Sequence, residues 1–237
     1  MSNENKVTPL QIINSALDQA LAADDSVLLF GEDVADPEGG GVNGATRGLS
    51  TKYGDSRVRS TPISEQAIIG AAIGAAMVGM RPVAEIMLMN FTTVAMDMIT
   101  NHAAKLRFMS GGQTELPMTI RVTTGAGFGT GGQHADYLEA WFAHTAGLKV
   151  VTYSNPVEAA GLLLSSIFDD DPVIFIESLP GYYAGAGPAP EEGARIPLGV
   201  ASTVREGSDV TVISYGPQVV LRCKPPKNWQ RTASTSR

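Results

Sequence analysis

The chain has 237 residues and a formal net charge of −7, and its 43% hydrophobic and 17% charged residues are typical of a globular core rather than of disorder. The acidic balance without a basic stripe argues against nucleic acid as a partner, and the single cysteine, Cys223, excludes an internal disulfide framework. The polar start has no signal-peptide core, and the longest apolar run (67–80) is shorter than the ~18–20 residues that span a bilayer, so we expect a cytoplasmic protein outside the membrane.

Strands and helices alternate along most of the chain. Thr8-Pro9 is an N-cap followed by proline, and it opens a helix predicted from about Pro9 to Ala22. Further helices are predicted at 67–80, 91–108 and 157–168. Short apolar segments predict buried strands at 27–30, 81–88, 118–122, 148–151, 172–177 and 210–216. This alternation predicts an α/β fold with a doubly wound, mainly parallel sheet.

One carboxylate stands at the start of the longest apolar segment. Ser64 is a candidate N-cap, and Glu65 would lie in the first helical turn, where the helix dipole favours an anion. A carboxylate beside apolar surface tends to have a raised pKa, which makes Glu65 a candidate for proton transfer. First-turn acids are also common signals of a helix start, so a purely structural Glu65 is the alternative.

The composition divides the chain into unequal parts. Residues 1–179 carry the predicted α/β domain, and the Gly/Pro/Ala-rich stretch from 180 to 208 is typical of a linker. Residues 209–221 contain one further predicted strand, which should open a second α/β domain of the same kind. Only about twenty residues follow the end of that strand, so we interpret 209–221 as the beginning of a truncated C-terminal domain.

The last residues, 222–237, are polar, broken by proline and unlike the preceding chain. When the codons that could encode this tail are read in the frame that starts at their third base, one possible translation is an amphipathic helix followed by a glycine stop and the start of a strand. We therefore hypothesise that the tail is out of frame from a point at or just before Arg222, which would make Cys223 an artefact. Several of these codon positions are degenerate, so coincidence is the alternative.

A glycine-rich loop follows the strand predicted at 118–122. Gly127 to Gly132 fits G-x-G-x-x-G, but no acidic residue ends a strand about twenty positions on, so a tight turn is favoured over dinucleotide binding. His134 closes the loop where α/β sheets bind ligands, and a histidine suits proton relay; a surface histidine is the alternative. His102 and His144 lie on predicted helices and are assigned to packing or hydrogen bonding. The histidines and the cysteine have no zinc-ligand spacing.

Several sequence blocks occur in the order typical of one family. The chain up to Val220 resembles the beta subunit of the thiamine-diphosphate-dependent 2-oxo acid dehydrogenase component, with the transketolase-type pyrimidine-binding fold. The blocks are Gly31-Glu32-Asp33-Val34, Arg47-Gly48-Leu49, Lys52-Tyr53-Gly54, Thr61-Pro62-Ile63-Ser64-Glu65, Arg81-Pro82, Glu85, Asn90-Phe91, Ala103-Ala104-Lys105, Met109-Ser110-Gly111-Gly112, Gln133-His134, Gly147-Leu148-Lys149-Val150-Val151 and Asp169-Asp170-Asp171-Pro172-Val173.

The resemblance implies roles for particular residues. Glu65 would hydrogen-bond N1′ of the cofactor's aminopyrimidine ring and so promote formation of the nucleophilic carbon that attacks the 2-oxo carbonyl. Phe91 would pack on that ring, with Ile63 and Met87 nearby. Carbon dioxide leaves and the acyl group passes to a lipoyl group, a transfer in which His134 would assist. The cofactor supplies the electron sink, and the protein supplies orientation and control of protonation.

Two further features follow from the resemblance. In the family, Ser and a Gln usually follow the active-site histidine, whereas Ala135 and Asp136 follow His134 in this chain. The hydrogen bonding around His134 is therefore expected to differ. Many members also bind a structural potassium ion through main-chain and carboxyl oxygens. The corresponding positions here are Met118, Ser166, Ile167, Asp169 and Asp171.

The family's motif for diphosphate and magnesium, Gly-Asp-Gly followed by Asn, is absent; Gly54-Asp55-Ser56 does not replace it. In this family the motif belongs to an alpha subunit. The resemblance therefore implies an α2β2 assembly that shares thiamine diphosphate and Mg²⁺ between subunits, with a lipoyl acyltransferase core as a further partner. The substrate would be pyruvate or a branched-chain 2-oxo acid, or acetoin in a variant. The alternatives are a truncated subunit that binds partners without turnover and a fragment of a transketolase-like synthase.

Overall fold

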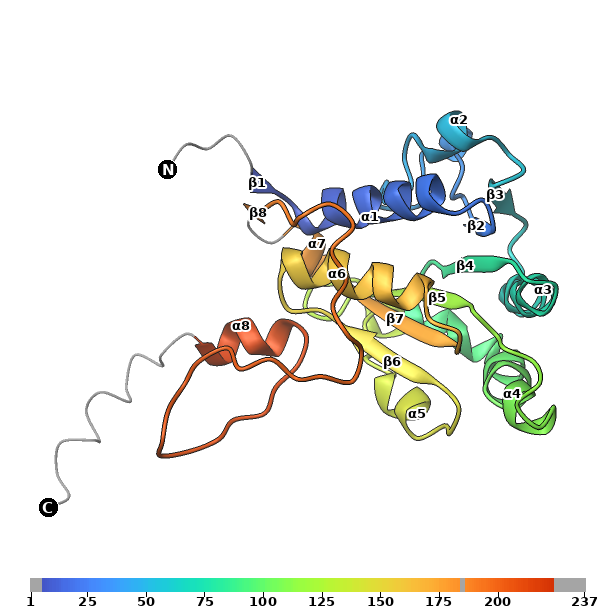
Figure 1. The fold of residues 1–237 in the computed structure, drawn as a ribbon. Helices are drawn as coiled ribbons and strands as arrows, with labels where there is room; N and C mark the ends of the chain where they lie inside the picture. Colours follow the sequence, from blue (N-terminus) through green and yellow to red (C-terminus); the bar gives the residue numbers. More distant parts are fainter. Residues whose placement is uncertain (1–5, 184–185, 224–237) are drawn as a thin grey trace, which may run out of the picture.

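A six-stranded sheet forms the centre of the molecule, and each neighbouring pair of its strands is parallel. The computed structural model describes residues 6–183 and 186–223 (Figure 1). The strand order is β3-β2-β4-β5-β7-β6, which confirms the predicted doubly wound α/β fold. The strands are β2 (Val27–Glu32), β3 (Val58–Thr61), β4 (Arg81–Ile86), β5 (Thr119–Thr124), β6 (Lys149–Thr152) and β7 (Val173–Ser178).

The order of the strands reverses at β2. The chain passes from β2 to β3 on one side and then returns to place β4 on the other side of β2. Open α/β sheets bind ligands at such a reversal, in the crevice beyond the carboxyl ends of the strands. The residues that end β2 and follow β3 and β4 are therefore the first place to look for a site.

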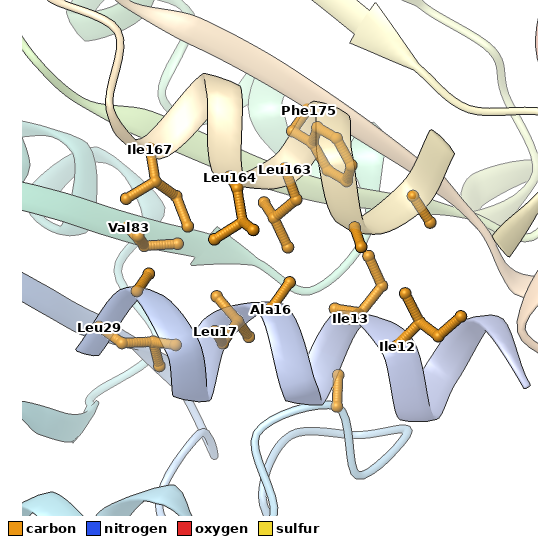
Figure 2. Packing of buried hydrophobic residues seen from close by; sticks show 14 of the residues in the cluster. Ile12, Ile13, Ala16, Leu17, Leu29, Val83, Leu163, Leu164, Ile167 and Phe175 are labelled. Carbon is orange, nitrogen blue, oxygen red and sulfur yellow. The ribbon is translucent and has the colours of Figure 1, made fainter. Parts of the chain in front are cut away.

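One face of the sheet is covered by α1 (Pro9–Ala23) and α6 (Pro156–Ile167), which lie side by side (Figure 1). A capping box between Thr8 and Gln11 begins α1, as the sequence predicts for this helix. Figure 2 shows the apolar side chains of α1, among them Ile13 and Leu17, directed at Leu164 of α6 and at the sheet. Burial of this apolar surface stabilises the layer that supports the strands.

The opposite face is covered by α3 (Glu65–Met77) and by the helical segments that follow β4. Ile68, Ile69 and Ala72 of α3 are buried against the sheet. Ser64 is the N-cap residue of α3, as predicted. Its side chain, however, makes no capping hydrogen bond to the first turn of the helix. The outer end of the helix is apolar and exposed, with Val78 79% exposed just beyond it.

The prediction of one helix over 91–108 is wrong. The segment contains three short helical pieces: the 3₁₀ helix η3 (Met89–Thr93), the π-helix η4 (Met98–Ala103) and α4 (Leu106–Met109). The hydroxyls of Thr92, Thr93 and Thr100 donate to main-chain carbonyls three or four residues earlier. Such bonds compete with the regular helical ladder, and sequence periodicity does not register this competition.

The prediction of a strand over 210–216 is also wrong. These residues form no strand, and Val210, Val212 and Ile213 are exposed. A strand needs a hydrogen-bonded neighbour, and the described residues provide none for this segment. The stretch predicted as a linker contains part of α7 (Leu179–Tyr182) and β8 (Gly187–Pro188), which pairs with β1 (Lys6–Val7).

The chain after β8 runs along α6 before it reaches α8 (Pro217–Cys223) (Figure 1). Ile196 packs so tightly on Gly161 of α6 that a Cβ at Gly161 would lie 2.6 Å from the Ile196 side chain. Residues 222 and 223 of the tail interpreted as out of frame lie within α8, and 224–237 lie outside the described residues. None of the helices in the described ranges is long and apolar enough to cross a membrane.

Candidate functional site

Two carboxylates meet at the carboxyl edge of the sheet, where the strand order reverses. Glu65 is the first residue of α3 and only 8% exposed, so its carboxylate lies largely out of contact with solvent. Glu32 is the last residue of β2, pairs in register with Thr61 and is 7% exposed. Even-numbered residues of β2 face the α3 side, because Phe30 packs with the α3 cluster while Leu29 packs with α1. Glu32 therefore points to the side where Glu65 lies.

Glu32 is held in an unfavourable environment. Burial raises the pKa of its carboxyl group, the negative charge of Glu65 raises it further, and the main-chain amide of Ser64 offsets only part of this effect. The Oε1 atom is buried and has no hydrogen-bond partner among the described residues. Buried polar atoms without partners destabilise a fold and are concentrated at functional sites. The pair of Glu32 and Glu65 therefore makes this edge the candidate functional site.

The Glu32→Gln variant is expected to be more stable than the wild type, by about 1–3 kcal/mol near pH 8, because it removes a buried negative charge whose Oε1 atom has no hydrogen-bond partner among the described residues. The raised pKa of Glu32 means that the folded chain holds a proton on this group above its ordinary value of 4.5. The stability that Glu32 contributes is then greatest below that value and falls as pH rises through the folded pKa.

The stability advantage of Glu32→Gln over the wild type should therefore shrink near pH 4.5. Urea unfolding at both pH values measures it, with Glu206→Gln on the exposed surface as control. An equal or lower stability of Glu32→Gln at pH 8 would refute the assigned environment.

Apolar and aromatic residues flank the carboxylates. Ile63 precedes α3 by two residues and is 84% exposed, an unusual position for so large an apolar side chain. Met87 directly follows β4 and is half-buried. Phe91 lies in η3 and is half-buried against the cluster that contains α3. A carboxylate with an exposed aliphatic side chain and an aromatic ring at the same sheet edge can bind a flat heteroaromatic ring by one hydrogen bond and by stacking.

His134 lies next to Phe91. The two rings meet edge to face with their centroids 5.5 Å apart, so the structure brings these predicted residues together. Asp136 accepts a hydrogen bond from Asn90 at 2.7 Å and so ties the histidine's segment to η3. The loop before His134 leads into a 3₁₀ turn (Gly132–His134) rather than a long helix, which fits the tight-turn interpretation of its glycines.

The other two histidines lie elsewhere. His102 is in η4 with its Nε2 3.4 Å from Asp97, and both side chains are more than half exposed. His144 follows α5 (Glu139–Ala143) and is exposed. Across residues 6–183 and 186–223, no three His, Cys, Asp or Glu side chains form a group that could hold a metal ion.

The positions implied for potassium lie at the opposite edge of the sheet. The segments are adjacent, because the carbonyl of Met118 accepts from the Val173 amide at 3.0 Å and the Ser166 carbonyl accepts from Asp169 at 3.3 Å. The carboxylates already have cationic partners: Lys149 lies 2.7 Å from Asp169, and Arg107 lies 2.6 Å from Asp171. Burial raises the pKa of Asp171, but the hydrogen bonds from Arg107 and Lys149 outweigh it and hold the pKa below its ordinary value. A further cation could therefore rely mainly on main-chain oxygens.

A second buried charged cluster lies on the α1 side of the sheet, and the sequence reasoning did not identify it. Arg121 of β5 donates to both carboxyl oxygens of Glu177 at 2.6 and 2.8 Å and to Glu85 at 2.5 Å. The hydroxyl of Tyr182 donates to Glu177 as well. Burial raises the pKa of Glu85, the charge of Glu177 adds to this, and Arg121 offsets it in part. The sequence signal was a charged residue in the middle of each of three apolar strands.

Comparisons with known proteins agree with this geometry. The family model described as the transketolase pyrimidine-binding domain matches residues 5–183. A subunit beta of acetoin:2,6-dichlorophenolindophenol oxidoreductase from Cupriavidus necator is 47% identical over 212 residues, 86% of this chain and 62% of that protein. A pyruvate dehydrogenase E1 component subunit beta from Acholeplasma laidlawii is 44% identical, over 89% of this chain and 64% of its own length.

A mitochondrial 2-oxoisovalerate dehydrogenase subunit beta from Dictyostelium discoideum is 45% identical, over 91% of this chain and 58% of its own length. The chain thus spans less than two thirds of the length of these relatives. Among solved structures, a split-gene transketolase described as an inactive beta4 tetramer matches with a TM-score of 0.68 and 17% identity, over 90% of this chain and 64% of that chain. At this identity the structural match concerns the fold alone.

Proposed function

Because the chain belongs to the transketolase pyrimidine-binding domain family, we propose that it is the beta subunit of a thiamine-diphosphate-dependent 2-oxo acid or acetoin dehydrogenase. The observation that carries the proposal is the buried carboxylate pair beside Ile63 and Phe91 at the reversal of the strand order. The relatives named for acetoin and for pyruvate have 47% and 44% identity, so the substrate is left open between the two classes.

In this proposal the site binds the aminopyrimidine ring of thiamine diphosphate. The cofactor supplies a nucleophilic carbon and an electron sink for cleavage of the bond next to a carbonyl group. Glu65 accepts or donates the proton at the ring nitrogen N1′, a role that suits a buried carboxylate that makes no ion pair with any other described residue. Ile63 and Met87 contact the ring's apolar surface, and Phe91 packs on its face. The 84% exposure of Ile63 supports this, because a bound ring would cover it.

His134 is proposed to assist transfer of the acyl group to a lipoyl carrier. Its edge-to-face contact with Phe91 holds the imidazole beside the aromatic residue proposed to pack on the cofactor. Imidazole can donate or accept a proton near neutral pH, as acyl transfer to a thiol requires.

The remaining half of the site is proposed to lie on an alpha subunit, which would bind the diphosphate and Mg²⁺. The sequence lacks the Gly-Asp-Gly motif with its following Asn. The exposed apolar end of α3, with Met77 53% and Val78 79% exposed, supports a subunit interface there. The proposed assembly is α2β2 bound to a lipoyl acyltransferase core.

We further propose that a potassium ion binds at the opposite edge of the sheet. If the main-chain oxygens near Met118 and Ser166 bind this ion, the melting temperature should be about 2–4 °C higher in KCl than in choline chloride, for about 1 kcal/mol of binding free energy. The ion pairs of Asp169 and Asp171 limit the expected gain. Calorimetry at matched ionic strength measures this shift. Identical melting temperatures in the two salts would show that potassium does not bind at this edge.

The function is tested by co-expressing the full chain with an alpha subunit of an acetoin or pyruvate dehydrogenase. The purified complex is assayed with pyruvate, 2-oxoisovalerate and acetoin, using both a dye and a lipoyl domain as acceptors. Turnover with one of these substrates that requires both chains and thiamine diphosphate supports the proposal. A complex that assembles and binds cofactor without turnover supports the alternative of a non-catalytic subunit.

A further inference from the structure

Two large aromatic side chains stack on each other at the edge of the sheet that carries His134. Phe128 is 50% exposed and Tyr183 is 58% exposed, and their ring centroids lie 5.8 Å apart with an interplanar angle of 17°. They come from different elements: Phe128 from the loop after β5 and Tyr183 from the residue after α7. We propose that this pair is an aromatic clasp that holds the 125–134 loop in place and thereby positions His134. The inference rests on the role of His134 in the proposed function.

The loop needs an external attachment, because its own sequence resists order. Five of the eight residues from 125 to 132 are glycine, and Gly127, Gly129 and Gly131 have positive φ. Glycine loses more conformational freedom on ordering than any other residue. Phe128 is the single large apolar side chain between 125 and 133. Its stacking on Tyr183 is therefore the contact that fixes the tip of the loop.

Movement of the tip would be transmitted to His134 through the base of the loop. The Gly125 amide donates to the His134 carbonyl at 2.9 Å, and the Thr130 hydroxyl lies 3.3 Å from the same carbonyl. The packing is tight here: a Cβ at Gly125 would lie 2.3 Å from Thr130 Oγ1 and 2.5 Å from the His134 carbonyl oxygen. The loop between Gly125 and His134 is thus closed at its base, and its main chain includes the histidine itself.

The other half of the clasp is rigidly anchored. Ser178 caps α7 by accepting from the Gly181 amide at 3.2 Å, and Leu179 is buried. Tyr182 is 1% exposed and donates to the buried Glu177. Since Tyr182 is fixed in the core, the adjacent Tyr183 is held at the surface as a platform for Phe128.

The first test needs no enzymatic activity. Hydrogen–deuterium exchange of the full chain, alone and with the alpha subunit, is followed in peptides covering 125–134. Phe128→Ala and Tyr183→Ala should raise exchange in this loop by about three- to tenfold, the range expected for loss of one aromatic pair. Tyr183→Phe keeps the stack and should exchange like the wild type. Phe108→Ala, 82% exposed in α4, is the matched control. Unchanged loop exchange in both alanine variants would overturn the clasp.

The second test asks whether the clasp acts through His134. In the assembled complex, Phe128→Ala should lower kcat with a lipoyl domain by about tenfold, because a small displacement of a positioned catalytic group lowers the rate steeply. The rate with dichlorophenolindophenol should fall less, because His134 is proposed to assist transfer to the lipoyl carrier. Tyr183→Phe, which keeps the stacked ring, should retain the wild-type lipoyl-dependent rate. The Phe128→Ala/His134→Ala variant should be no slower than His134→Ala alone. Additive losses would contradict positioning of the histidine. A complex inactive with every substrate would refute the proposed function, while the exchange result would still decide on the clasp.

Discussion

Replacing Glu65 with glutamine is expected to reduce substrate turnover by about 10²–10⁴-fold in the assembled enzyme, the usual contribution of a positioned acid–base group. Glutamine preserves the size of the side chain and can still hydrogen-bond, but it does not exchange a proton. The variant should therefore bind thiamine diphosphate and fold normally. Its defect should be located at the cofactor, as slower exchange of the cofactor's C2 hydrogen with deuterium, measured by NMR after acid quench.

Stability separates this catalytic role from a structural one. Glutamine at position 65 loses the favourable charge at the N-terminus of α3, worth about 0.3–1 kcal/mol, but it also removes the repulsion from Glu32. These effects oppose each other, so the melting temperature should change little. The exposed Glu115→Gln serves as control for both measurements. Full turnover in Glu65→Gln would exclude the assigned role, and an unfolded variant would point to a structural helix start.

The fold could be predicted where local pattern and tertiary structure agree. The apolar strands at 27–30 and 172–177 are buried by their composition, and the Thr8-Pro9 start of α1 is a strong local signal. The errors arise where long-range contacts decide. The segment 91–108 is divided by threonine hydroxyls that bond to the main chain, and 210–216 has strand composition but no neighbouring strand in the described chain.

The candidate site was predicted in part for the same reason. Glu65 is recognisable because a first-turn acid before an apolar helix is a local signal. Its neighbour Glu32 is recognisable only after the β2–β3 register pairs Glu32 with Thr61 and brings the start of α3 beside it. The ion cluster around Arg121 likewise depends on the register of β4, β5 and β7. Sequence shows the charged residues in these strands, but not which of them face one another.

Replacing Arg121 with methionine is expected to destabilise the chain by about 3–5 kcal/mol at pH 8, a large share of the ~5–15 kcal/mol that holds a typical domain folded. The guanidinium is 2% exposed and, among the described residues, is the one cation that contacts the carboxylates of both Glu85 and Glu177. Burial works against its charge, but the two carboxylates outweigh this effect and hold the pKa of Arg121 above its ordinary value. Methionine fills similar space and leaves both acids buried without a cation.

The pH dependence identifies the cause of this loss. Without Arg121 nothing offsets the burial that already raises the pKa of Glu85. A carboxyl group with a raised folded pKa stabilises the fold below its unfolded pKa and ceases to do so as pH rises through the folded pKa. The loss of stability in Arg121→Met, measured by urea unfolding, should thus be smaller near pH 5 than near pH 8, whereas the exposed Arg59→Met should show no such trend.

Adding Glu85→Gln and Glu177→Gln to Arg121→Met should recover part of the lost stability, because neutral amides cost less to bury than unpaired charges. A deficit that is independent of pH, and that the added substitutions do not reduce, would mean that Arg121 acts through packing and not as the counter-ion of these acids.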